Sequence, residues 1–599
     1  MWKKTKRLRK ITDSEDLVIG KVISVTNEYI NAKYEKNIHT FSPIIGGKTV
    51  RIGEIGAWVK IDLGIRNLIG EIIEVSINPI EIKNKYKEFT NVEERFFKIK
   101  LIGELSSDEG FIRGIVHYPS IDDEIKTLKD RDWKKIYPPP DENSELVYVG
   151  KLKNLPNRKA HVYIDKLVSR HFLIAGMTGS GKSNFAAVLI TNILKSMRTP
   201  HILLFDIFGE YINYFRSLNY DDHIQILSPT NDSKPYLFPV WLLTIDEIND
   251  IFHIDFSDPN LKKLIYGLKL EHFIEKEEKG ESGLFPNEEL IDAETPIPID
   301  FKKILSRIKF CNNAVVTRGN KNSEFITDKG KIQIEEIDFF CLEETNGEEI
   351  TIENATFQTS NGSSRIYHKY HHRYSGLIKT LQDILENRRY FHFFPTPNDF
   401  SLKEWYEAIK SLFSKKLTII DLSDQTYSLR KSIIRVILSK LLAIYQNNSE
   451  HQLSPFFLLL EESHKFIEIK EIYDILREYR KFGLGIGLIS QRPSKISDNT
   501  LSQIGTYGVL RMTNERDIQI MQQILPDHYL TTIPRLPILQ TGEMILMGEA
   551  SPRPQYIKVP PLTQKKEGSD PYLIESWNRE DFSEDLDNLE EILKKILTR

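Results

Sequence analysis

Residues 176–183 read Gly-Met-Thr-Gly-Ser-Gly-Lys-Ser and fit the pattern Gly-x-x-x-x-Gly-Lys-Ser/Thr. An apolar strand-like run, 172–175, enters this loop, and a helical run leaves it from Asn184. Glycines let such a loop wrap a phosphate, while the helix N-terminus faces the anion. We therefore expect a nucleoside triphosphate site, in which Lys182 reaches the β- and γ-phosphates and Ser183 ligates Mg²⁺. The alternative, a chance match in a turn, does not explain the strand and helix on either side.

Apolar strands alternate with helical segments from about residue 160 onward. Continuous apolar strands suit a parallel sheet that is buried on both faces. The sequence therefore predicts an α/β fold: a RecA-like P-loop core with a mainly parallel sheet. The strands expected in this core are His171–Ala175, His201–Phe205, Leu417–Leu422, Pro455–Leu460 and Leu484–Ser490.

The pattern of predicted strands and helices changes on either side of this core and within it. Short strands broken by glycines predict a small N-terminal β-barrel, which a Pro-rich break at 138–140 separates from the core. The expected parts are a basic tail at 1–14, the barrel at 15–150, the first part of the core at 151–244, a mostly helical insertion with some strands at 245–400, the second part of the core at 401–562, and an acidic tail or helix at 563–599.

Bulk composition narrows the class of protein. The chain has 599 residues, 40% of them hydrophobic and 28% charged, as in globular proteins. The net charge of −4 does not by itself indicate nucleic-acid binding. The only cysteines, Cys311 and Cys341, exclude a disulfide framework and a four-cysteine zinc site. Because no apolar run reaches transmembrane length and no signal peptide is evident, we expect a cytoplasmic protein without a membrane partner.

Two adjacent carboxylates follow the apolar run 456–460. A P-loop needs an acid at the end of another strand, and Glu461 is placed to hold Mg²⁺ directly or through water. Glu462 is placed to orient and deprotonate the attacking water. The alternative is a strand that merely ends at the surface.

Three further segments contain candidate site residues. Asp206 and Glu210 follow a predicted strand, and strand-end carboxylates lie on the ligand side of an open α/β sheet, although a simple turn is the alternative. Gln491 ends another strand, where a neutral amide can sense the γ-phosphate. The cluster Arg477, Arg480 and Lys481 is either a solvated helix face or the source of an arginine finger for a neighbouring subunit.

Three histidines, His368, His371 and His372, lie in a basic and aromatic stretch. A metal site is conceivable there, but no Cys or Asp/Glu cluster accompanies the histidines. An ordinary polar surface, or a contact with phosphate or protein, explains the stretch better.

Taken together, these motifs resemble the HerA family of ring-forming DNA translocases, relatives of FtsK. The resemblance is carried by the P-loop with its flanks from Arg170 to Asn184, by Asp206-x-x-Gly209-Glu210-Tyr211, by Glu461-Glu462-Ser463-His464, by 477–483 with Ser490-Gln491-Arg492-Pro493, by 511–514 with Pro537, Gly542-Glu543 and Gly548, and by the N-terminal strands. The sequence departs from the family pattern at Phe208, Ser463 and Tyr479. Tyr479 replaces a common Gly, which leaves the register of the arginine finger open.

The resemblance implies a homohexameric ring that binds ATP and Mg²⁺ between subunits. The implied nucleotide-binding residues are Gly176, Thr178, Gly179, Ser180, Gly181, Lys182, Ser183, Asn184, Asp206, Glu210 and Arg170. The implied catalytic residues are Glu461, Glu462, Gln491 and, from the next subunit, Arg480, while Arg477, Arg492 and Arg511 are the other arginines that can supply the finger. Ser183 and Glu461 are the implied magnesium ligands, and Arg170 is a residue that can couple nucleotide state across the interface.

Two functions follow from the resemblance. The first is a motor that drives duplex DNA through the ring and works with a partner nuclease or another effector, in DNA end processing or antiphage defence. The second is an ATPase scaffold that assembles and switches a toxic effector, such as a nuclease or a sirtuin-like NADase, with little translocation. A P-loop enzyme that acts on a small molecule is a third reading, but no acceptor-binding motif supports it.

Overall fold

A computed structural model of the chain describes most of residues 17–562. The described ranges are 17–35, 44–45, 48–49, 54–83, 89–106, 110–137, 145–153, 158–218, 222–228, 239–280, 285–313, 315–317, 324–327, 330–333, 365–367, 372–387, 390, 393–397, 401–447, 453–524, 533–551 and 554–562. The predicted tails at 1–14 and 563–599, together with Cys341, His368 and His371, lie outside these ranges.

The chain forms two compact units. The first, here called the P-loop unit, comprises residues 1–170, 174–185 and 492–560. The second, here called the carboxylate unit, comprises residues 171–173, 186–491 and 561–599. The division passes through strand β12 (Phe172–Ala175) and helix α3 (Lys182–Ser196), so the P-loop lies between two elements whose residues belong to both units.

The P-loop unit begins with a closed β-barrel. Its strands follow the order β2-β1-β9-β5-β6-β7-β8, and an additional pairing of β2 with β7 closes six of them into a ring. Alternate residues of β2, namely Ile30, Ala32 and Tyr34, are buried and fill the interior together with Ile19 and Val22 of β1. The predicted small barrel is thereby confirmed. Its strands are β1 (Val18–Val25), β2 (Tyr29–Tyr34), β5 (Trp58–Asp62), β6 (Arg66–Lys83), β7 (Phe89–Ser106), β8 (Phe111–Arg113) and β9 (Glu124–Thr127), and the short pair β3 (Ile44–Ile45) and β4 (Lys48–Thr49) lies between β2 and β5 in the chain.

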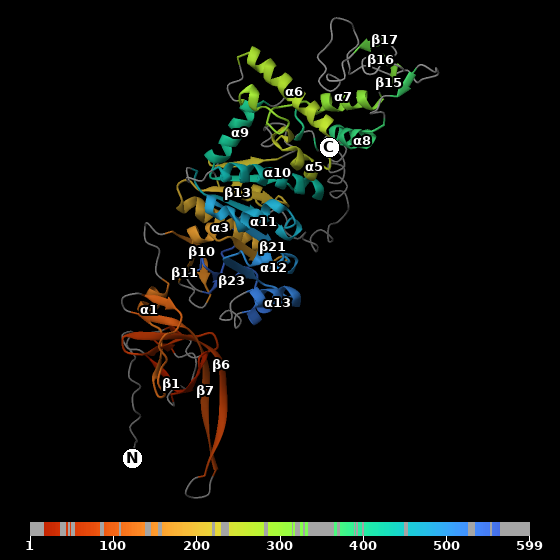
Figure 1. Ribbon diagram of the computed structural model, residues 1–599. Coiled ribbons are helices and arrows are strands. Elements are labelled where there is room, and N and C mark those ends of the chain that lie inside the picture. The colour runs from red at the N-terminus through yellow and green to blue at the C-terminus, as the bar shows by residue number, and fades with distance from the viewer. Residues whose placement is uncertain are drawn as a thin grey trace, which may run out of the picture. The chain divides into compact units, whose positions relative to one another are not determined.

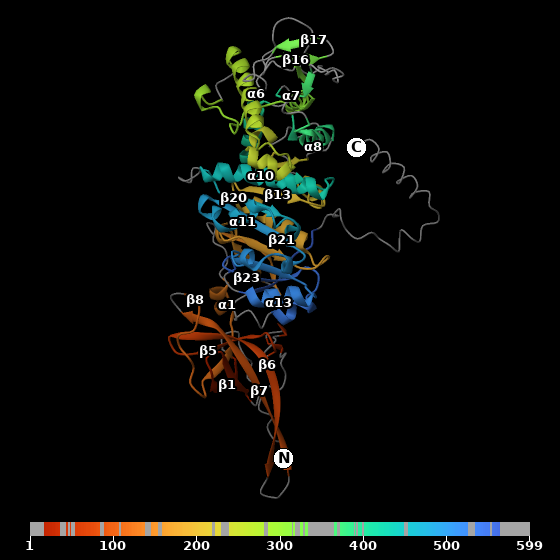
Figure 2. The ribbon, with the colours of Figure 1, turned by 45° about the vertical axis from the view of Figure 1, so that its right-hand side comes forward.

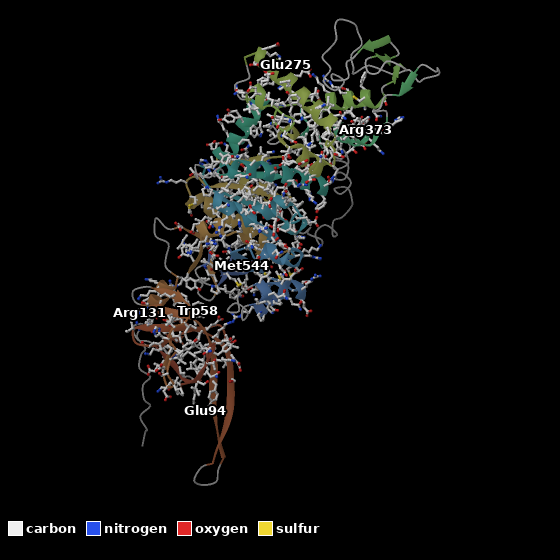
Figure 3. All side chains as sticks on the ribbon, in the orientation of Figure 1. Trp58, Glu94, Arg131, Glu275, Arg373 and Met544 are labelled. Atoms are coloured by element: carbon white, nitrogen blue, oxygen red, sulfur yellow. The ribbon has the colours of Figure 1, made fainter. Side chains whose placement is uncertain are left out.

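Strands β6 and β7 form a hairpin that is much longer than the other barrel strands. Each strand has 18 residues, and their pairing continues to Lys83 opposite Phe89. In both ribbon views the hairpin extends well beyond the body of the barrel (Figures 1 and 2). Helix α1 (Asp130–Ile136) packs against the barrel, where the rings of Trp133 and Trp58 have centroids 5.6 Å apart. Figure 3 labels Trp58 and, from α1, Arg131.

The rest of the P-loop unit is built on strands in the order β11-β10-β24-β23-β22-β12. Neighbours from β11 to β22 run antiparallel. These strands are β10 (Leu146–Leu152), β11 (Lys159–Tyr163), β22 (Thr506–Leu510), β23 (Glu543–Gly548) and β24 (Gln555–Lys558). They are accompanied by α2 (Ile164–Ser169), η8 (Pro493–Lys495), α12 (Asp498–Leu501), α13 (Glu515–Ile524) and η10 (Ile533–Ile538).

The carboxylate unit contains the parallel part of the fold. Its strands follow the order β21-β20-β13-β19-β14, and every neighbouring pair is parallel. All residues of β20 and β21 are buried, as the continuous apolar runs predicted. With parallel strands here and antiparallel strands in the P-loop unit, the predicted α/β class is confirmed. The elements are β13 (His201–Asp206), β14 (Ile224–Leu227), β19 (Leu417–Asp421), β20 (Phe456–Leu460) and β21 (Leu484–Ser490), with helices α4 (Ile212–Arg216), α10 (Tyr427–Gln446) and α11 (Lys470–Arg477).

Between β14 and β19 the chain forms an additional, mainly helical part of the carboxylate unit. Thr244 caps helix α5, and the capping residue Glu247 also pairs with Lys440 of α10 at 3.2 Å, which fastens this part to the core. A four-stranded sheet has the order β17-β16-β15-β18. The elements are η1 (Val240–Leu242), α5 (Ile245–Phe252), α6 (Pro259–Glu278), η3 (Glu288–Leu290), α7 (Phe301–Asn313), β15 (Val315–Thr317), β16 (Glu324–Thr327), β17 (Gly330–Gln333), β18 (Arg365–Tyr367), α8 (Ser375–Glu386) and α9 (Leu402–Ser414).

None of the helices in the described ranges is both long enough and apolar enough to span a bilayer.

Candidate active site

The P-loop follows β12 directly and leads into α3. Gly179 and Gly181 have φ angles of 74° and 108°, in the left-handed region that favours glycine. The loop closes on itself, because the amide and the hydroxyl of Ser180 both donate to the carbonyl of Met177, at 3.2 and 2.7 Å. The residues at the tip, Thr178 and Gly179, are exposed. The result is a preshaped concave turn of backbone at a helix N-terminus, which is the geometry that binds phosphate.

Backbone groups from distant parts of the P-loop unit hold this turn in place. The amide of Met177 donates to the carbonyl of Arg511 at 2.9 Å, and the amide of Gly542 donates to the carbonyl of Ser180 at 2.8 Å. At the start of α3, Nδ2 of Asn184 donates to the carbonyl of Pro560 at 2.9 Å. Asn184 therefore supports the start of α3, and its contact with the nucleotide stays a prediction.

Lys182 lies at the first position of α3 with its side chain largely buried. Its Nζ donates to the carbonyl of Met177 at 3.2 Å. An anionic phosphate in the turn would place its negative charge beside this buried ammonium. Ser183, next to it, is partly exposed.

The carboxylate unit brings together the acidic residues expected from the sequence. Glu461 is 3% exposed, and burial raises the pKa of its carboxyl well above the ordinary value. The negative charges of Asp206, Glu210 and Glu462 raise the pKa of Glu461 further. Such crowding of carboxylates stores repulsion that a bound cation relieves.

Asp206 organises the turn that follows β13. The amides of residues 208–210 donate to Oδ1 at 2.8–3.3 Å, and the amide of Tyr211 donates to Oδ2 at 3.0 Å. Burial raises the pKa of Asp206 to about 6, despite these hydrogen bonds. The amide of Ile207, the residue directly after Asp206, donates instead to Oε2 of Glu461 at 3.3 Å. Asp206 is thus turned toward its own backbone, whereas Glu210 has a partly exposed side chain.

Glu462 has an unusual backbone. Its φ of 48° is left-handed, a conformation that a non-glycine residue rarely adopts and that clusters at functional sites. Nε2 of Gln491 donates to its Oε1 at 2.5 Å, so the structure brings these two predicted residues together. The hydroxyl of Ser463 is also engaged, because it donates to the carbonyl of Ile489 in β21 at 3.2 Å.

The four arginines that can supply an intersubunit finger differ in their surroundings. Arg477, Arg480 and Arg492 have exposed side chains, and the guanidinium of Arg477 lies 5.3 Å from the ring centre of Tyr473. Arg480 lies in the short helix η7 (Tyr479–Phe482), which follows α11. Arg511 is partly buried, and its carbonyl supports the P-loop.

Arg170 is held within the P-loop unit. Its Nε lies 3.3 Å from Oε2 of Glu549, and its carbonyl accepts a hydrogen bond from the amide of Gly505 at 2.6 Å. The exposed side chain is therefore already paired. Its coupling role stays a prediction.

Two histidines at the site were not assigned a role from the sequence. His171 directly precedes β12, is fully buried and has a left-handed φ of 56°. His464 follows the carboxylate pair, and its Nδ1 lies 3.3 Å from Oε2 of Glu462. A polar residue in an otherwise apolar strand entry was the available signal for His171, while the short spacing from Glu462 was the signal for His464.

The residues present fit a magnesium ion that relies on other ligands. Within the described ranges, no group of three or more His, Cys, Asp or Glu side chains is arranged to hold a metal by itself, and this includes His372. Mg²⁺ commonly takes one or two protein ligands, and phosphates and waters complete its shell. The partly exposed hydroxyl of Ser183 and the crowded carboxylate of Glu461 are donors of this kind.

A strand, a glycine loop and a lysine-bearing helix, together with paired carboxylates at the end of a buried parallel strand, define a P-loop ATPase. Residues 147–441 match the family model described as "Helicase HerA, central domain". This central region of the chain belongs to the HerA family.

Curated relatives extend the similarity beyond this central region. The chain is 25% identical over 497 residues to a probable DNA double-strand break repair helicase HerA of Methanocaldococcus jannaschii, which covers 81% of this chain and 89% of the relative. It is 24% identical over 592 residues to the DNA double-strand break repair helicase HerA of Sulfurisphaera tokodaii, with 94% and 97% covered. Among solved structures, VirB4 of Thermoanaerobacter pseudethanolicus aligns with a TM-score of 0.41 at 14% identity, over 73% of this chain and 99% of VirB4.

Proposed function

We propose that the chain hydrolyses ATP to move duplex DNA through a homohexameric ring. The observation that carries the proposal is the buried pair Glu461–Glu462, with Glu462 engaged by Gln491, in a chain whose P-loop is complete and preshaped. Binding of a triphosphate needs only the P-loop. Hydrolysis needs a positioned base as well, and the carboxylate pair supplies it.

Each of the site residues has a distinct role in ATP binding or hydrolysis. The backbone of 176–181 cradles the β-phosphate, and Lys182 neutralises the β- and γ-phosphates. Glu462 orients the attacking water and takes its proton, while Gln491 donates to the γ-phosphate. Asp206 acts indirectly, because its oxygens shape the turn that presents Glu210.

Mg²⁺, when bound, neutralises the charge that develops on the β- and γ-phosphate oxygens. Ser183 and Glu461 are the residues of this chain that would hold it. The negative charges of three neighbouring carboxylates disfavour the ionised form of Glu461. A cation bound there would relieve this repulsion.

Arg480 is the best candidate for a finger that acts on a neighbouring subunit. Its side chain is exposed, and η7 is tied to the core, since the amide of Gly483 donates to the carbonyl of Arg480 at 3.1 Å and the amide of Phe456 donates to the carbonyl of Gly483 at 2.9 Å. A guanidinium on a short, fixed support is suited to reach across an interface. Such a finger makes the site complete only in an oligomer.

The choice of DNA as the cargo comes from the relatives, which are named as DNA double-strand break repair helicases. A partner nuclease or another effector, including one that acts in antiphage defence, is part of the same proposal, as is a cytoplasmic location. The second candidate function is a scaffold that assembles and switches a toxic effector. It is favoured by the helices α5–α9 and the four-stranded sheet β15–β18, which form an additional surface on the carboxylate unit (Figure 1).

One pair of assays separates the two functions. ATP turnover is measured with and without linear duplex DNA, and displacement of a labelled strand or of a bound protein roadblock is followed in parallel. A motor shows turnover that rises with DNA and displacement that requires ATP. Turnover that DNA leaves unchanged, without displacement, would instead support the scaffold.

A further inference from the structure

Both carboxylate oxygens of Glu462 face potential donors from within the carboxylate unit. Gln491 donates to Oε1 at 2.5 Å, and Nδ1 of His464 lies 3.3 Å from Oε2. The side chains of Glu462 and His464 are 4% and 8% exposed, so these contacts lie in the interior, where polar interactions are stronger than at the surface. The left-handed backbone of Glu462 fits this picture, because strained residues persist where their surroundings fix them.

We infer that His464 is a positioning residue that acts with Gln491 to restrain Glu462 and so limits ATP hydrolysis. The inference rests on the proposed function, in which Glu462 is the base. A carboxylate whose two oxygens both contact donors is less free to turn toward a water than one held on a single oxygen.

Gln491 connects this restraint to the nucleotide. The side chain that donates to Oε1 of Glu462 is the same one that is proposed to meet the γ-phosphate. When the amide of Gln491 turns toward the γ-phosphate, its contact with Oε1 is lost and one oxygen of Glu462 is released. His464 still restrains the other oxygen, so His464 sets the remaining barrier to activation.

The same two segments of chain carry both donors. His464 lies in η6 (Ser463–Lys465), and its Nδ1 is 3.4 Å from Oγ of Ser490, the residue next to Gln491. Two other hydrogen bonds hold the η6 turn. The hydroxyl of Ser463 donates to the carbonyl of Ile489 at 3.2 Å, and the amide of Lys465 donates to the carbonyl of Glu462 at 2.9 Å. Because these hydrogen bonds do not involve the imidazole, loss of the His464 contact is expected to change the rate of ATP hydrolysis rather than the fold.

The test uses the full-length protein with three substitutions of His464. His464→Asn places an amide nitrogen near the position of Nδ1 and keeps the contact. His464→Leu fills most of the volume without a donor, and His464→Gln keeps a polar group but moves its donor away from the Nδ1 position. We expect the Leu and Gln variants to raise kcat for ATP without DNA about two- to tenfold, the effect of losing one hydrogen bond, with KM unchanged. The Asn variant is expected to match the wild type.

The inference is overturned if kcat of the Leu and Gln variants equals or falls below that of the wild type while their melting temperature and ATP affinity are retained. If the Leu variant does not fold, the comparison of Gln with Asn decides in the same way. Glu462→Gln, measured alongside, separates this inference from the proposed function. Normal turnover in that variant removes the base assignment itself, whatever the His464 variants do.

Discussion

Nδ1 of His171 accepts a hydrogen bond from the backbone amide of Ile486 at 3.2 Å. The contact joins the residue that precedes the P-loop strand to the middle of β21, whose two ends are flanked by Arg480 and Gln491. An accepting Nδ1 requires a neutral imidazole. Burial, with a smaller contribution from the charge of Arg480, lowers the pKa of His171 to about 4.

This burial predicts a pH-dependent contribution to stability. The pKa of His171 is lower in the folded state than its unfolded value of about 6.5, so the unfolded state takes up the proton first as the pH falls. The contribution is fully present above pH 6.5 and is lost on acidification toward pH 4, by about 3 kcal/mol.

The matched control is His171→Asn, which keeps an acceptor near Nδ1, tolerates the left-handed backbone and does not titrate. Chemical denaturation of both proteins at pH 7 and pH 4.5 gives the difference in unfolding free energy at each pH. Wild type should lose stability relative to the variant on acidification. Opposing effects of the buried carboxyl of Asp206 are common to both proteins and cancel. A difference that does not vary with pH would contradict the assignment.

Gly176→Ala is expected to abolish ATP binding. An added Cβ would lie 2.8 Å from Oγ of Ser180 and 2.9 Å from Cβ of Leu510, so the closed turn would have to open. Gly376→Ala is the control, because a Cβ at that position in α8 meets nothing within 4 Å and alanine favours a helix. Binding of a fluorescent ATP analogue separates the two. Equal affinity of both variants would show that the turn is not the phosphate cradle.

Arg480→Ala is expected to retain ATP binding and lose hydrolysis, since a finger acts on the neighbour's nucleotide in the transition state. Mixing this variant with Glu462→Gln tests the role in trans. An interface that takes Arg480 from the Glu462→Gln subunit and Glu462 from the Arg480→Ala subunit is complete, so mixed rings should recover turnover that neither variant has alone. The exposed neighbour Arg477, changed to Ala, serves as the control with near-normal turnover. No recovery on mixing would argue for a structural arginine.

Lys60 and Asp132 form a buried ion pair in the barrel, with Nζ and Oδ2 2.8 Å apart. Asp132→Ala removes this carboxylate from beside the buried Lys60 ammonium and is expected to destabilise the P-loop unit by about 3–5 kcal/mol. The double variant Lys60→Met with Asp132→Leu removes both charges and should recover most of that stability. Thermal unfolding of the three proteins measures this. A double variant as unstable as Asp132→Ala would show that these side chains stabilise the unit through contacts other than the one between them.

Local motifs made much of the fold and site predictable. The spacing of Gly176–Ser183 and the apolar run before Glu461 are short-range patterns, and each imposes its own strand and loop geometry. The partners that hold the P-loop were not predictable, because the carbonyls of Arg511 and Pro560 and the amide of Gly542 are backbone groups far away in the chain. Any residue offers such groups, so no pattern marks them.

The direction in which a side chain points could not be predicted from the sequence either. The expected place of Asp206 at the nucleotide stays a prediction, and the sequence does not show that its oxygens accept hydrogen bonds from the amides of residues 208–211. A strand-end carboxylate has the same sequence signature whether it faces a nucleotide or its own backbone. The pairing of β2 with β7, which closes the barrel, likewise depends on long-range register rather than on local alternation.

The central claim is that Glu462 is the base of an ATPase built on this P-loop, and the most direct measurement is ATP turnover by Glu462→Gln. The account predicts that this variant binds ATP like the wild type and loses turnover by a factor of roughly 10² or more, with and without duplex DNA, whereas Lys182→Ala loses binding as well. Normal turnover in Glu462→Gln would contradict it.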